Sequence, residues 1–117
     1  MPMLRIETSA ELGADKARDV ASKGSALLAK TLGKPEQYVM TSVSRAAAMS
    51  MAGKTDTPCA FCVVRSIGGL SPDRCKELSR ILCDFIQAEL GVAPECVYLN
   101  FAEIDADCWG WDGTTFG

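Results

Sequence analysis

The chain carries one pattern twice, because each half begins with a short apolar strand, continues through an amphipathic helix and ends in a second strand. The two helix exits resemble each other, reading LGKPEQYVM from Leu32 and LGVAPECVYLN from Leu90. Strands joined through a helix are parallel, and the crossover is right-handed in nearly all proteins. Two such pseudo-symmetric β-α-β units side by side predict an α/β fold, a four-stranded mixed sheet with both helices on one face.

The boundaries of these elements follow from hydrophobic spacing and from residues that start or stop helices. Ser71 followed by Pro72 is typical of a helix start, and Gly33 and Gly91 are typical of helix ends. The expected elements are strands at Met3–Ile6, Tyr38–Val43, Cys59–Ile67 and Cys96–Phe101 and helices at Asp15–Leu32 and Pro72–Leu90. A chain of 117 residues can bury one core, so we expect a single domain over residues 1–117.

Helices on one face leave the other face of the sheet uncovered. Val63 and Leu99 lie in expected strands, and both are too apolar to face water. A sheet with a bare apolar face needs a partner, most simply copies of the same chain in a closed ring.

The charge pattern excludes several classes of partner. The net charge is −3, and no basic face favours nucleic acid. The start of the chain carries Glu7, Glu11 and Asp15 and no unbroken apolar run, unlike a secretory signal peptide. No stretch approaches the length of a membrane span. We therefore expect a cytoplasmic protein that does not insert into membranes.

The chain has six cysteines and no histidine. Without histidine, Ser/His and Cys/His triads are excluded, and the commonest ligand of catalytic zinc is missing. Four of the cysteines lack the paired spacing of a zinc cluster: Cys75, Cys83, Cys96 and Cys108. We therefore expect no bound metal. Acid–base chemistry must come from a carboxylate, a lysine, a tyrosine, a cysteine or the amino terminus.

The second residue, Pro2, is a candidate for that chemistry. Initiator methionine is usually removed when the next residue is small, so we expect a mature chain that starts with a secondary amine. An α-amino group titrates at about 7.7–8.0, close enough to neutrality to act as a general base. Many Met-Pro starts have no function, and the dipeptide alone does not decide between the two interpretations.

Six segments together carry a family resemblance: MPML, LGKPEQYVM, PCAFC, SIGGLSPD, VYLNF and WGWDGTTFG. With these segments in this order, the sequence resembles the macrophage migration inhibitory factor family, within the tautomerase superfamily. The resemblance implies a homotrimer whose sheets line a central channel and whose sites lie at subunit interfaces. It also implies a keto–enol tautomerase without a cofactor, acting on small aromatic keto acids such as phenylpyruvate, with dopachrome-like compounds as a second class.

The same resemblance assigns roles to residues of this chain. Pro2 matches the catalytic base, and Lys34 matches the lysine that steadies the substrate carboxylate and lowers the pKa of the proline. Ser66 and Ile67 match the pocket wall, and Arg65 adds a second cation near the entrance. The remaining matches are aromatic residues at the pocket mouth, Tyr38, Trp111 and Phe116, and a pair lent by a neighbouring subunit, Tyr98 and Asn100. Trp109 departs from the family pattern: it replaces a smaller apolar wall residue, and we expect it to narrow the pocket.

Two other functions stay open. Cys59 and Cys62 form a C-x-x-C motif, and some animal members of the family are proposed thiol–protein oxidoreductases. In redox enzymes, however, such a motif lies at a helix start, whereas here it begins an apolar strand, where both residues fit a core. The second alternative is a cytokine-like binding protein with vestigial catalysis, secreted without a signal peptide and recognised by a cell-surface receptor.

Overall fold

The computed structural model describes residues 1–117, and it contains the doubled strand–helix–strand pattern. The first half holds β1 (Pro2–Thr8), α1 (Ala14–Leu32) and β2 (Met40–Arg45), and the second holds β3 (Ala60–Ser66), α2 (Pro72–Leu90) and β4 (Val97–Glu103). Short 3₁₀ helices lie at η1 (Glu36–Tyr38), η2 (Pro94–Cys96) and η3 (Ala106–Cys108), and a small hairpin of β5 (Gly110–Trp111) and β6 (Thr114–Thr115) ends the chain.

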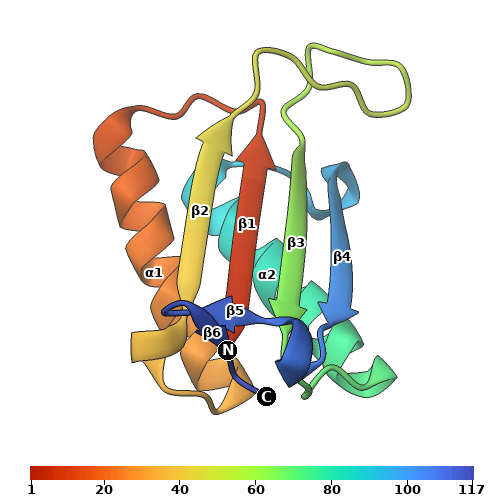
Figure 1. The fold of residues 1–117 in the computed structure, drawn as a ribbon. Coiled ribbons are helices and arrows are strands. Elements are labelled where there is room, and N and C mark those ends of the chain that lie inside the picture. The colour runs from red at the N-terminus through yellow and green to blue at the C-terminus, as the bar shows by residue number, and fades with distance from the viewer.

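The four long strands form one mixed sheet in the order β2-β1-β3-β4 (Figure 1). β1 pairs with β2 and β3 pairs with β4 in parallel, whereas β1 and β3 run antiparallel. The predicted α/β architecture is therefore confirmed. The amino-terminal end of β1 and the carboxyl-terminal hairpin lie at the same end of the sheet (Figure 1).

Both helices cover the same face of the sheet, and the core lies between the two layers. Inward-facing strand residues such as Leu4, Ile6 and Val64 are buried in one cluster with Val20 of α1 and Leu82 of α2. The predicted helix ends are also present. The Ser71 side chain accepts a hydrogen bond from the amide of Arg74, and Gly33 and Gly91 end the helices in the left-handed conformation with φ of 63° and 70°.

Some of the predicted boundaries were wrong. Tyr38 and Cys96 were expected in strands, but each ends a 3₁₀ turn. A proline begins each turn, since Pro35 precedes η1 with φ of −62° and Pro94 is the first residue of η2. Proline fixes φ near the value such turns need, so the strands start only after the turn closes.

The face of the sheet opposite the helices is mixed in character. The strand register places Arg5, Val63 and Asn100 side by side on this open face. Val63 is half-buried there, as expected, but Leu99 alternates to the helix side and packs against the core. The prediction that Leu99 faces outward was wrong because the alternation in β4 starts at the buried Val97. None of the helices combines the length and apolar character that crossing a bilayer requires.

Candidate active site

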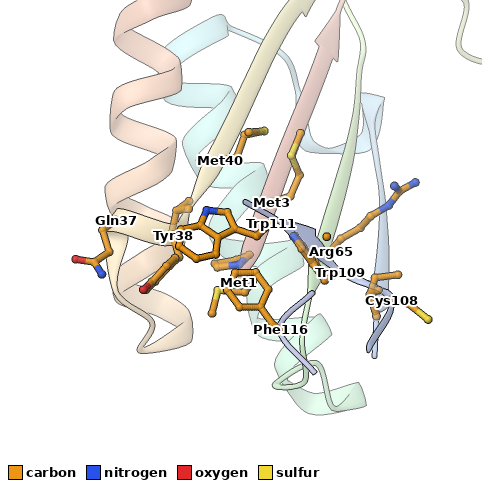
Figure 2. A pocket seen from close by; sticks show the side chains of 14 residues that line it. Met1, Met3, Gln37, Tyr38, Met40, Arg65, Cys108, Trp109, Trp111 and Phe116 are labelled. Carbon is orange, nitrogen blue, oxygen red and sulfur yellow. The ribbon is translucent and has the colours of Figure 1, made fainter. Parts of the chain in front are cut away.

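A cavity of about 580 Å³ opens at the start of β1. Six of the residues selected from the sequence line it: Pro2, Tyr38, Arg65, Trp109, Trp111 and Phe116. Figure 2 shows the side chains of Tyr38, Arg65, Trp109, Trp111 and Phe116 around the start of β1, contributed by η1, β3 and the carboxyl-terminal segment. Residues separated along the chain therefore meet at one end of the sheet, and the volume suits a small organic ligand.

Aromatic side chains form one wall of this cavity. The rings of Trp111 and Phe116 stack with centroids 5.5 Å apart, and Tyr38 meets both edge-on at 6.0 Å and 6.1 Å. The β5–β6 hairpin holds Trp111 in place through a tight turn in which Asp112 and Gly113 have φ of 51° and 79°. Such a wall presents flat apolar surface to an aromatic ring.

The amino-terminal amine lies beside this wall and close to Lys34. Burial lowers the pKa of the Met1 amine from its ordinary value, and repulsion by the Lys34 ammonium lowers it further. The position of Lys34 is fixed by the turn after β3, because its Nζ donates a hydrogen bond to the carbonyl of Ile67 at 2.8 Å. A neutral amine next to a fixed cation can accept a proton from an anionic substrate.

Lys34, Ser66 and Ile67 are adjacent to the cavity but are not among the residues that line it. Ser66 is fully buried and lies opposite Pro2 in the β1–β3 pair. Arg65 lies at the rim, and its guanidinium extends away from the aromatic rings (Figure 2). The charged side chains of the lining are thus cationic, and no aspartate or glutamate is among them.

Tyr98 and Asn100 are not brought to this cavity. Both lie on the open face of β4, where Tyr98 is 65% exposed and the Asn100 amide donates only to the neighbouring Leu99 carbonyl. Within one chain, therefore, they take no part in the pocket around Pro2.

The sequence reasoning missed several lining residues: Met1, Met3, Gln37, Val39, Met40, Ile104, Cys108 and Gly110. Met3 and Met40 are register partners in the β1–β2 pair. A parallel register cannot be read from composition, so no signal identified this methionine pair. The only signal in the sequence for three other lining residues was their closeness along the chain to the selected Trp109: Ile104, Cys108 and Gly110.

The C-x-x-C cysteines lie in the core and form no disulfide. Cys62 is fully buried, and burial together with the nearby Cys83 raises its pKa to about 12. Cys59 is buried just before β3, so the predicted strand began one residue too early, and its Sγ accepts a weak hydrogen bond from the Ser9 hydroxyl. A thiol with so high a pKa is a poor nucleophile, so this arrangement does not favour thiol–disulfide exchange.

The doubled strand–helix–strand sheet, with a cavity around a buried Pro2 and a lysine beside it, places this chain in the class of tautomerase-superfamily folds. The family model described as Macrophage migration inhibitory factor (MIF) matches residues 1–117. The macrophage migration inhibitory factor homolog of Trichinella spiralis is 34% identical over 116 residues, covering 99% of this chain and 100% of that protein. The Rattus norvegicus macrophage migration inhibitory factor is 33% identical over 116 residues, with 99% of each covered.

A solved structure gives the same result. The macrophage migration inhibitory factor homologue from Prochlorococcus marinus matches with a TM-score of 0.92 and 38% identity, covering 98% of this chain and 99% of that chain. The chain belongs to the macrophage migration inhibitory factor family.

Proposed function

We propose that this protein is a keto–enol tautomerase that acts on phenylpyruvate-like keto acids, with dopachrome-like compounds as a second substrate class, and that Pro2 is its general base after removal of Met1. The observation that carries the proposal is that Pro2 lines an aromatic cavity at the amino terminus, where burial and the Lys34 ammonium lower the pKa of the Met1 amine. The same surroundings should lower the pKa of the Pro2 amine once Met1 is removed. Family membership supports the reaction class.

The chemistry follows from the charges around the cavity. Pro2 takes a proton from the carbon next to the ketone, and the electron pair of that C–H bond moves toward the carbonyl oxygen. Solvent water donates a proton to the oxygen, which completes the enol, and the protonated Pro2 amine returns its proton to solvent. The reverse sequence restores the ketone. Lys34 attracts the substrate carboxylate, and the wall of Tyr38, Trp111 and Phe116 faces the aromatic ring. Ser66 and Ile67 form the adjoining wall.

The open face supports a homotrimer, because Tyr98 and Asn100 point away from their own pocket and remain exposed. In a closed ring, each open face lies toward the central axis, and these two side chains reach the cavity of the next protomer. Each active site would then combine Pro2 and Lys34 from one chain with Tyr98 and Asn100 from another.

The test is the rate of phenylpyruvate tautomerisation, followed through the absorbance of the enol, with intact mass confirming that Met1 is absent. Processed protein should catalyse the reaction, and Pro2→Gly should lose most of the activity because the rigid secondary amine is replaced by a flexible primary one. A Pro2→Gly variant as active as wild type contradicts the assignment of the base.

A second function is supported by the names of the relatives, which describe a factor acting on macrophage migration. We propose that any such activity uses the exposed surface rather than the reaction, and that it requires export of a protein whose default location is the cytoplasm. Cell-surface binding should then persist in Pro2→Gly. Binding that disappears together with tautomerisation would contradict an independent role.

A further inference from the structure

Ser66 carries the one buried side-chain polar atom that has no hydrogen-bond partner in the structure. The residue is 0% exposed, so its Oγ has no access to bulk water. Thr8, a buried hydroxyl residue on the neighbouring strand, shows the usual arrangement, since its Oγ1 donates to the Cys59 carbonyl at 2.8 Å and accepts from the Ala10 amide at 3.1 Å. Buried hydroxyl groups nearly always have partners because an unpaired one destabilises the fold. The Ser66 hydroxyl therefore requires an explanation.

The register of the sheet places this hydroxyl against Pro2. Ser66 pairs with Pro2 across the antiparallel β1–β3 ladder, and both side chains are buried on the helix side. The Ser66 carbonyl is turned the other way and accepts the Ile104 amide at 2.9 Å. Pro2 and Ser66 are therefore a non-hydrogen-bonded pair, the type in which Cα atoms are about 4.5 Å apart and side chains approach most closely.

The chemical state of the Pro2 nitrogen decides whether it can be that partner. While Met1 is attached, the nitrogen is a tertiary amide that has no hydrogen to donate, and its lone pair is delocalised. Once Met1 is removed, the same nitrogen is a secondary amine with one N–H donor and one free lone pair. Processing would thus create a hydrogen-bonding group on the residue that pairs with Ser66, at a chain end that is free to turn its nitrogen toward the unpartnered hydroxyl.

We propose that Ser66 is a positioning residue for the base: in the chain without Met1, Ser66 Oγ accepts the N–H of Pro2 and thereby directs the nitrogen lone pair into the cavity. The inference rests on the proposed function, because it names what orients the amine that carries the proton. When the amine is protonated, one N–H stays on Ser66 and the other is the proton exchanged with substrate.

The surroundings leave this role to Ser66. The ionisable side chains at this end of the sheet lie after α1 and β4 and on η1, β3, β4 and η3: Lys34, Glu36, Tyr38, Arg65, Glu103, Asp105, Asp107 and Cys108. None of them is hydrogen-bonded to Ser66 Oγ, and the Lys34 ammonium is already bound to the Ile67 carbonyl.

The first test compares Ser66→Ala with wild type in two forms of the protein, with Met1 removed and with Met1 retained. The retained form is made with methionine aminopeptidase inhibited, and intact mass verifies both forms. In the retained form, Ser66→Ala should leave the melting temperature unchanged or raise it, because the hydroxyl has no partner to lose. In the processed form, the same change should lower the melting temperature by a few degrees. Equal shifts in the two forms overturn the proposal.

The second test uses the processed enzyme with phenylpyruvate. Ser66→Ala should lower kcat about tenfold, the factor expected when one hydrogen bond that stabilises the transition state is lost. KM should change little. The acid limb of the pH–rate profile should move to lower pH, because the charge-assisted bond to the protonated amine is lost. Ser66→Thr keeps the hydroxyl, so both kcat and the pH position of the acid limb should return to the wild-type values. A kcat unchanged in Ser66→Ala overturns the proposal. If wild-type protein does not tautomerise phenylpyruvate, the proposed function fails, whereas the melting comparison still decides the role of Ser66.

Discussion

At the residue scale, Lys34 connects the end of α1 to the turn after β3, because its Nζ is bound to the Ile67 carbonyl at 2.8 Å. Its ammonium also contributes to the lowered pKa of the amino-terminal amine. In the proposed mechanism this one side chain attracts the anionic substrate and, once Met1 is removed, lowers the pKa of the Pro2 amine. The sequence predicted Lys34 from the family resemblance, but it did not predict the contact with Ile67. That contact depends on how two turns from different halves of the chain meet.

Replacing Lys34 by methionine should change both functions of the residue. Loss of the charge that faces the substrate carboxylate should lower kcat/KM for phenylpyruvate about 10- to 100-fold, mainly through KM. Loss of the repulsion should raise the pKa of the amine, so less of it is neutral at a given pH and the acid limb of the pH–rate profile moves to higher pH. Lys30→Met, in the exposed last turn of α1, is the matched control and should leave both unchanged. An acid limb that stays in place contradicts this account of Lys34.

The two buried thiols of the C-x-x-C motif should be unreactive in the folded protein. Burial raises the pKa of Cys62 to about 12, so almost no thiolate is present near neutral pH. Brief treatment with iodoacetamide, followed by peptide mapping, should label the exposed Cys108 and leave Cys62 unlabelled, whereas both should be labelled in denaturant. Native labelling of Cys62 at the rate of Cys108 would favour the redox interpretation instead.

At the scale of elements, the sequence predicted what depends on neighbours along the chain. The Ser71 cap and the glycine ends of both helices were found because their signals are local. Tyr38 and Cys96 were misplaced because each follows a proline that starts a 3₁₀ turn, and the apolar residues beyond it resemble a continuous strand. Leu99 was assigned to the wrong face because strand alternation has two possible phases, and only packing chooses between them.

The cap of α2 gives a test at this scale. The Ser71 side chain accepts from the Arg74 amide at 3.2 Å, which satisfies one of the free amides of the first turn. Ser71→Ala should lower the free energy of unfolding by about 1 kcal/mol, whereas Ser71→Gly should lower it by only a few tenths, because glycine is tolerated at this position. Chemical denaturation measures both. Equal losses would show that the hydrogen bond is not the source of the stabilisation.

At the scale of the whole molecule, one chain forms the cavity around Pro2 but leaves Tyr98 and Asn100 outside it. One chain brings Pro2 and the aromatic wall together in one cavity at one end of its sheet. Figure 2 shows the wall formed by Tyr38, Trp111 and Phe116. Tyr98 and Asn100 remain on the open face of β4, where Tyr98 is exposed and the Asn100 amide bonds only to the adjacent Leu99 carbonyl. The proposal that these two side chains serve a neighbouring subunit comes from the family resemblance alone, since residue spacing within one chain does not show which subunit a side chain serves.

Mixing two defective variants tests the division. Asn100→Ala and Pro2→Gly should each form trimers with little activity, and sedimentation should give three times the chain mass of 12.5 kDa. After unfolding and refolding together in equal amounts, some sites should combine an intact Pro2 with an intact Asn100 from the neighbouring chain. Activity should then return to roughly a quarter of the wild-type value. No recovery, with mixed trimers verified by mass, would place Asn100 in the site of its own chain.

The central claim is that the nitrogen of Pro2 is the base, and that it becomes a base only when Met1 is removed. The most direct measurement compares kcat/KM for phenylpyruvate between processed protein and protein that retains Met1, each verified by intact mass. The account predicts activity in the processed form and the loss of most of it in the retained form, because an amide nitrogen cannot accept the proton. Equal turnover by the two forms would contradict it.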